Sequence, residues 1–252
     1  MAGMTDLPLL AAAGLLAGLM NAIAGGGSFV TFPALVLAGL PPVIANATST
    51  VALFPGTVAS SYAYRHSLVT IGGYGPRVLG PISALGGLIG AILLLVTPVR
   101  LFDAVIPWLL LLATLTFVFG PRLGLTLRRL VRVGPRTLPW VQLAISVYGG
   151  YFGGAVGLMM MAAWSLLTAS DDLKSMAPAR VLLVSAANGA AVLCVVASGA
   201  VHWPETLAML GASVVGGYLG ARVGQCLPPR LTRGFVVVLS MVIMVSFFVK
   251  AL

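Results

Sequence analysis

Ten apolar stretches follow one another along the chain, separated by short polar breaks. Most approach the length of about 20 apolar residues that a helix needs to cross a bilayer. The stretches are 7–24, 28–39, 45–63, 78–96, 101–119, 138–158, 159–169, 178–199, 205–226 and 231–250. This pattern predicts an all-α polytopic membrane protein.

Composition strengthens that prediction. Of the 252 residues, 60% are hydrophobic and only 8% are charged, whereas soluble domains carry about 25% charged residues. A water-soluble fold is excluded, and no room remains for a folded domain outside the membrane. The net charge is +9, and the basic residues that produce it lie between the apolar segments. They therefore indicate orientation by the positive-inside rule rather than nucleic-acid binding.

The longest polar break runs from Pro121 to Thr137 and carries five arginines and no acid. We interpret 121–137 as a basic cytoplasmic linker between a first transmembrane repeat, 1–120, and a second, 138–252. The repeats share a GG-x-x-GA run, Gly86–Ala91 in the first and Gly216–Ala221 in the second. These small residues predict faces for close helix packing.

Each repeat opens with a long apolar region that glycines interrupt. If this region crosses once, the repeats are parallel; if it returns as a hairpin, they are inverted. With the linker inside, the returning arrangement places twelve basic residues inside and two outside, whereas single crossing gives eight and six. The positive-inside rule therefore favours two inverted repeats, each a glycine-broken helical hairpin plus three transmembrane helices.

The glycines Gly25, Gly26 and Gly27 break the first opening region at membrane depth, since each glycine in a helix costs about 1 kcal/mol relative to alanine. Such a break is tolerated only inside protein or beside a water-filled cavity. A helix restarting at Ser28 would point its amides and positive dipole end at the break, which favours an anion. Further donors nearby are Asn21, Asn46, Thr48 and Ser49. The alternative is a tight turn followed by ordinary helix caps.

The second half keeps glycines at Gly153, Gly154 and Gly157. Arg180 stands just inside the next apolar segment, where a charge is costly, and Asn188 follows two turns later on the same face. We predict Arg180 as a charged ligand for an anion and Asn188 as a further donor. The alternative for Arg180 is extension to the cytoplasmic interface.

Groups for other chemistry are scarce. The five acids lie near segment ends, so no carboxylate relay of the pump type is visible. Cys194 and Cys226 have no companion histidines and indicate packing rather than a metal site. ATP-binding and hydrolase motifs are missing. We therefore predict neither an enzyme nor a cofactor.

Two runs carry a family resemblance: NAIAGGGSFVTFPAL from Asn21 to Leu35 and GLPPVIANATS from Gly39 to Ser49. Weaker signals in the second half are Ala187–Ala191 and Gly199–Trp203. Together they resemble the sulfite exporter TauE/SafE family of membrane permeases. The resemblance implies a multi-pass transporter of the bacterial inner membrane for sulfur-containing anions such as sulfite or organosulfonates. Val156–Met161 replaces a polar glycine motif, which leaves the choice of anion open.

The predicted partners are therefore a small anion and the lipid bilayer, without nucleic acid and with oligomeric state left open. Two alternatives remain at this point. A passive anion channel would use the same residues without a carrier cycle. A non-transporting scaffold or accessory subunit would not need them at all.

Overall fold

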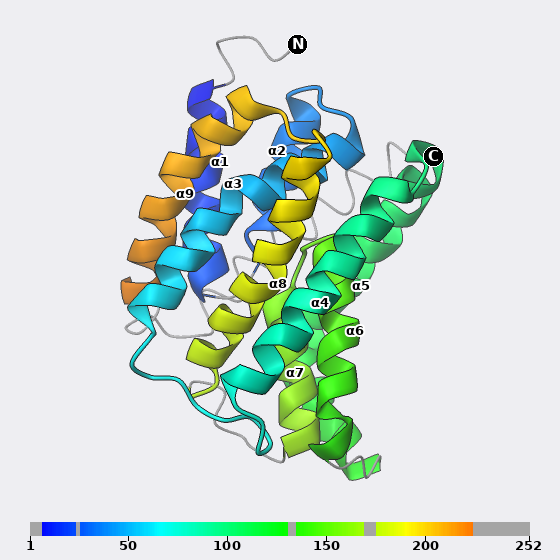
Figure 1. Ribbon diagram of the computed structural model, residues 1–252, viewed down its shortest axis with the longest axis vertical. Helices are drawn as coiled ribbons and strands as arrows, with labels where there is room; N and C mark the ends of the chain where they lie inside the picture. The colour runs from blue at the N-terminus through cyan, green and yellow to red at the C-terminus, as the bar shows by residue number, and fades with distance from the viewer. Residues whose placement is uncertain (1–6, 24–25, 131–134, 169–174, 224–252) are drawn as a thin grey trace.

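A computed structural model describes residues 7–23, 26–130, 135–168 and 175–223. In these ranges the chain is helical, with one isolated β-bridge between Ile71 and Tyr74 (Figure 1). The helices are α1 (Leu7–Ile23), α2 (Ser28–Leu37), α3 (Pro42–Ala63), α4 (Pro76–Val96), α5 (Val99–Leu130), a 3-10 turn (Pro135–Thr137), α6 (Leu138–Tyr151), α7 (Val156–Thr168), α8 (Ala177–Ala197) and α9 (Trp203–Val223). The all-α prediction is confirmed, and the stretch 231–250 lies outside the described residues.

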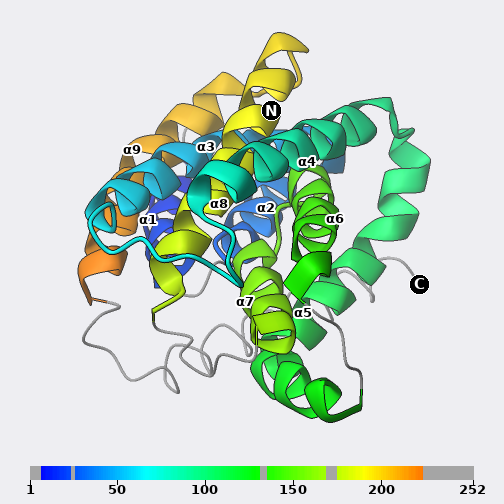
Figure 2. The same ribbon diagram turned by 60° about the horizontal axis from the view of Figure 1, so that its bottom comes forward.

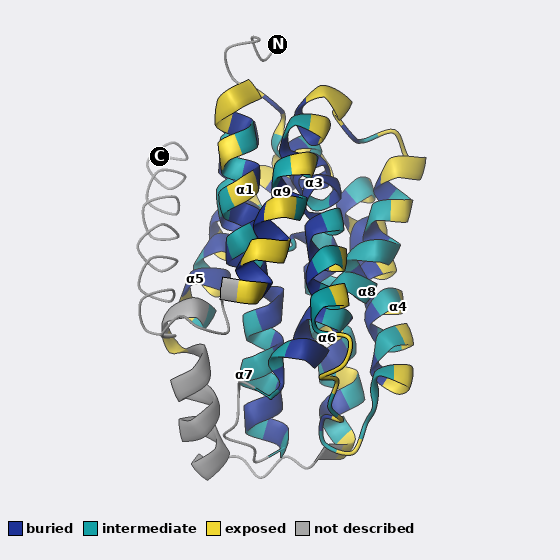
Figure 3. Cartoon of the chain, turned by 90° about the vertical axis from the view of Figure 1, so that its left-hand side faces the viewer, coloured by how far each residue is buried: buried dark blue, intermediate teal, exposed yellow. Residues whose placement is uncertain are grey.

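Four segments in the described ranges are long and apolar enough to cross a bilayer: Pro42–Ala63, Pro76–Val96, Val99–Thr116 and Ala177–Ala197. Their outward faces are apolar, as on α4, where Leu85, Ile92 and Leu93 are exposed. Figure 3 shows exposed positions recurring along the length of α4. Exposed apolar faces of this kind belong in lipid. The chain is a multi-pass membrane protein.

Two short helical hairpins interrupt the long helices. In Figure 1, α1 runs down from the upper end and α2 turns back upward, whereas α6 runs up from the lower end and α7 turns back. This arrangement is the one expected if each opening region returns as a hairpin instead of crossing the membrane once. The inverted relation between the two complete halves stays a prediction, because 231–250 is not described.

The halves are interleaved rather than separate. Helix α4 packs on α6 and α8, and α9 packs on α1 and α3, so the fourth helix of each half lies against the first and third helices of the other. The GG-x-x-GA glycines form these contacts: a Cβ at Gly87 would lie 2.0 Å from the carbonyl oxygen of Ala187, and one at Gly216 would lie 2.1 Å from that of Leu15. The predicted small-residue faces are therefore confirmed.

Two predicted boundaries differ from the structure. Helix α5 continues to Leu130, so the first ten residues of the predicted linker 121–137 are helical, since leucine and arginine are good helix formers. The second hairpin breaks at 152–155 rather than between the expected runs 138–158 and 159–169. Gly153, at φ +78°, ends α6, whereas Gly157 lies inside the first turn of α7.

Candidate functional site

The breaks of the two hairpins meet in the middle of the bundle. The hydroxyl of Ser28, at the start of α2, donates to the carbonyl of Gly153 in the other break at 3.3 Å. Gly153 has a positive φ of +78°, a conformation that only glycine adopts readily. The two interruptions therefore lie at the same depth, and the Ser28–Gly153 hydrogen bond joins them.

The return of the first hairpin depends on Gly27. A Cβ at this position would lie 2.5 Å from the carbonyl oxygen of Ala17 in α1, too close for any side chain. The carbonyl oxygens of Gly26 and Gly27 accept bonds from the N–H groups of Phe29 and Val30. The prediction that the glycines end one helix and Ser28 begins another is confirmed, although Gly25 itself lies outside the described residues.

Arg180, in the first turn of α8, reaches the end of α1. Its side chain is buried, with 3% of its surface exposed, and Nη2 donates to the carbonyl oxygens of Ala22 and Ile23 at 2.9 and 3.4 Å. These are the last residues of α1, where the helix dipole favours a cation. The burial contradicts the alternative in which Arg180 extends to the interface.

Asn46, near the start of α3, makes the corresponding contact in the other direction. Its Nδ2 donates at 2.8 Å to the carbonyl oxygen of Tyr151, the last residue of α6. In each half, the carbonyl groups at the end of the first helix therefore accept hydrogen bonds from a side chain on the third helix of the opposite half. We term these two contacts, by Arg180 on α1 and Asn46 on α6, the crossed caps. One is charged and the other neutral, so the centre is electrically asymmetric.

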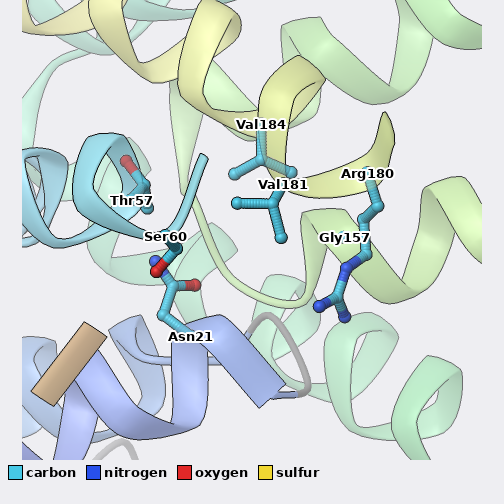
Figure 4. A pocket seen from close by; sticks show the side chains of 7 residues that line it. All are labelled: Asn21, Thr57, Ser60, Gly157, Arg180, Val181 and Val184. Carbon is cyan, nitrogen blue, oxygen red and sulfur yellow. The ribbon is translucent and has the colours of Figure 1, made fainter. Parts of the chain in front are cut away.

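A small pocket lies beside the Arg180 cap (Figure 4). The space open to the centre of a water molecule is about 10 Å³, enough for roughly one water. Hydroxyl groups on its α3 wall are engaged with backbone carbonyls, Thr57 with Phe54 and Ser60 with both Gly56 and Gly217. The lining residues are Asn21, Thr57, Ser60, Gly157, Arg180, Val181 and Val184.

Three kinds of donor remain for a guest in this pocket. The side-chain amide of Asn21 and the Nε and Nη1 groups of Arg180 carry no hydrogen bond to the described part of the chain. At the start of α7, Leu158 and Met159 bond to the carbonyl of Ala155, whereas the Gly157 amide has no backbone acceptor within the described ranges. The guanidinium, the amide and the positive end of a helix thus face one pocket, and no carboxylate from the described ranges lines it.

The other residues predicted for the site lie elsewhere around the breaks. Ser49 shares a hydrogen bond of 2.5 Å with Thr31, and Thr48 accepts a bond from the backbone N–H of His202 at 3.0 Å. Asn188 is half-buried on α8 and does not line the pocket. Of the predicted residues, the structure brings together Asn21, Gly157 and Arg180.

Sequence reasoning missed four lining residues: Thr57, Ser60, Val181 and Val184. The available signal for the two hydroxyls was the T-x-x-S spacing after Gly56 in the second half of α3. Such hydroxyls commonly bond to a carbonyl of their own helix, and both do so here, so the spacing alone does not mark a pocket.

Gly157 controls how close α7 comes to Arg180. A Cβ there would lie 3.0 Å from Cδ of Arg180 and 3.6 Å from Nε. We expect Gly157→Ala to displace the guanidinium and, if an anion binds in this pocket, to raise its KM by about 3- to 10-fold, the value of one hydrogen bond. The long arginine side chain can yield, so thermal stability should hardly change. Flux assays at varied anion concentration measure this effect.

Gly211→Ala is the matched control, because nothing lies within 4 Å of a Cβ at that position. This variant should keep the wild-type KM. An unchanged KM in Gly157→Ala would show that the α7 terminus does not contact the anion.

Broken helices that meet beside a small pocket lined by Asn21, Gly157 and Arg180 define a class of membrane protein, that of helical transporters with discontinuous helices. A family model described as "Sulfite exporter TauE/SafE" matches residues 10–247. The chain belongs to this family of membrane transporters, as its sequence motifs predicted.

Curated relatives agree with this assignment. A "Probable membrane transporter protein" of Haemophilus influenzae is 28% identical over 256 residues, covering 99% of this chain and 94% of the relative. The "Probable membrane transporter protein YfcA" of Escherichia coli K12 is 30% identical and covers 94% and 85%. "Probable membrane transporter protein ORF9" of a Sinorhizobium species is 32% identical and covers 93% and 89%. No solved structure matches the chain.

Proposed function

We propose that this protein exports a small sulfur-containing anion, such as sulfite or an organosulfonate, across the bacterial inner membrane. The anion would bind in the pocket beside the Arg180 cap. The observation that carries the proposal is the buried guanidinium of Arg180, which faces this pocket together with Asn21 and Gly157.

The charge of Arg180 is not neutralised by the protein around it. Its described partners are backbone carbonyls, and no carboxylate in the described ranges lies within salt-bridge distance of it. A charged residue inside the bilayer costs about 2.5–3.5 kcal/mol on insertion scales. An anion bound beside the guanidinium would offset that cost, whereas a cation or a neutral apolar guest would not.

The pocket also favours a small guest with several acceptor oxygens. Amide, guanidinium and backbone donors converge from α1, α8 and α7, which suits the oxygens of a sulfite or sulfonate group. The present volume, about 10 Å³, is too small for such a group, so we infer that the structure represents a closed state. Binding would require the hairpins to move relative to α3 and α8, as transporters with inverted repeats do.

Transport of labelled sulfite in proteoliposomes tests the proposal. We expect saturable efflux, competition by sulfoacetate, and acceleration by an inside-negative potential, which favours export of a monoanion by about 2.3 kcal/mol per 100 mV. Protein-free liposomes give the background. Sulfate, added as a third anion, shows whether the pocket selects among sulfur oxyanions.

Two outcomes would replace the proposal. A steady conductance across planar bilayers, without saturation, would favour the passive channel. Absence of flux for all three anions, together with an unchanged cellular phenotype when Arg180 and Asn21 are made apolar, would favour the scaffold or accessory subunit.

A further inference from the structure

A second, larger hollow lies on the outer surface, where α3 and α9 both end. The lower ends of these helices lie side by side in Figure 1. The hollow has a volume of about 250 Å³ and lies between the two helix ends. We name it the Arg65–Arg222 groove after its two charged residues; its lining is Tyr62, Ala63, Arg65, Tyr218, Ala221 and Arg222.

Both arginines are held in place by a tyrosine one turn earlier. The guanidinium carbon of Arg65 lies 3.9 Å from the ring centre of Tyr62, and Nη1 donates to the Tyr62 carbonyl at 2.9 Å. The guanidinium carbon of Arg222 lies 5.1 Å from the ring centre of Tyr218, and Nη2 donates to the tyrosine hydroxyl at 2.6 Å. Stacked in this way, the side chains lose less conformational entropy when they bind a guest.

The groove is strongly electropositive. It contains two guanidinium groups and no acid. In the described ranges the carboxylate of Glu205 pairs with His202 at the start of α9, a full helix length away from Arg222. Asp103, the other acid in the described ranges, also makes no salt bridge to either arginine. Within that part of the chain, the remaining N–H groups of both arginines are available to an anionic group. Two forked donors around one hollow suit a phosphate, which accepts bidentate bonds.

The groove opens outward, and its lining residues are separate from those of the central pocket. The side chains of Tyr62 and Tyr218 are 63% and 41% exposed, as expected for tyrosines at the lipid–water boundary. Behind them, Ser60 donates to the Gly217 carbonyl and the Tyr64 hydroxyl donates to the Ala221 carbonyl. These bonds close the contact between α3 and α9, so the groove is separated from the pocket at Arg180.

We propose that the Arg65–Arg222 groove binds the phosphate of an anionic phospholipid headgroup. The tyrosines mark the depth at which headgroups lie, and the groove is open to lipid rather than to the transport pocket. A phosphate held by both arginines would join the end of α3 to the end of α9. These helices belong to opposite halves, so the lipid would stabilise the interface between α3 and α9.

The test uses purified full-length protein, with lipid adducts measured by native mass spectrometry and unfolding measured by thermal melting. The probes are phosphatidylglycerol, phosphatidylcholine and inorganic phosphate. We expect phosphatidylglycerol to bind and to raise the melting temperature, and phosphatidylcholine to do neither. The double variant Arg65→Gln/Arg222→Gln should bind phosphatidylglycerol about tenfold more weakly, because both bidentate contacts are lost.

The matched control is Arg77→Gln/Arg136→Gln, which removes the same charge from two exposed arginines outside the groove. It should retain wild-type binding. Equal losses in both double variants would indicate general charge attraction and overturn the proposal. An equal melting shift with inorganic phosphate would assign the groove to a free anion instead of a lipid.

A folding defect in the glutamine variant would not prevent the test. Arg65→Lys/Arg222→Lys keeps the charge but removes the forked donors and the planar stacking on tyrosine. It should lose most of the lipid adducts while its elution from a sizing column stays normal. Retention of full lipid binding in this variant would contradict the proposal.

Discussion

We expect Arg180→Gln to lower sulfite efflux from proteoliposomes by about 10- to 100-fold, since a hydrogen bond to a charged group contributes about 1.5–3 kcal/mol and each 1.4 kcal/mol is a factor of ten. Two effects combine in this variant. The pocket loses the one cation among its described lining residues, and the last carbonyls of α1 lose their donor. Arg180→Lys should keep part of the activity, because the lysine ammonium retains the positive charge but lacks the planar set of donors of a guanidinium.

Two comparisons separate binding from folding in this experiment. Arg77→Gln removes the same charge from an exposed position at the start of α4 and should transport at the wild-type rate. Asn46→Ala removes the neutral cap on Tyr151 and leaves the charge intact, so it should affect stability more than KM. If Arg180→Gln folds and exports sulfite normally, the anion does not bind at Arg180.

The second large effect concerns the helix packing between the two halves, where α9 contacts α1 and α4 contacts α8. We expect Gly216→Ala to lower the melting temperature by about 5 °C or more, because overpacking costs about 1–3 kcal/mol. The new Cβ would lie 2.1 Å from the carbonyl oxygen of Leu15, so backbone against backbone must separate. Thermal melting of the purified protein, followed by aggregation on a sizing column, measures the change.

Gly87→Ala should reproduce this loss from the other half, with its Cβ 2.0 Å from the Ala187 carbonyl oxygen. Gly211→Ala, on the same helix as Gly216, has open space around its Cβ. It should be neutral or slightly stabilising, because alanine is the better helix former. Equal melting temperatures for all three variants would mean that the interleaved packing does not occur in the membrane.

The sequence was most informative where its signals are local. Apolar runs separated by turns predicted most of the described helices to within a few residues, although α5 runs eleven residues past its predicted end and α6 stops seven residues short. Three consecutive glycines predicted the first break. The second break was placed late, because Gly153, Gly154 and Gly157 offer three possible positions. Of these three glycines only Gly153 has a positive φ, and the amino-acid sequence does not distinguish it from the other two.

The site was harder to predict, because its contacts join distant parts of the chain. Asn46 and Tyr151 are 105 residues apart, and Arg180 and Ala22 are 158 apart. An arginine in an apolar segment signals that some partner exists, but not that the partner is a helix end in the other half. The charge of Arg180 was therefore recognised from the sequence, while its attachment to α1 required the fold.

The crossed caps have a consequence for how such a protein can assemble. Each half supplies the donor that completes an interrupted helix in the other, and an unpaired carbonyl at membrane depth costs several kcal/mol. Neither half is therefore a self-sufficient folding unit in lipid. On the predicted duplication, a single-repeat ancestor would have met this requirement only as a pair of copies, each completing its neighbour.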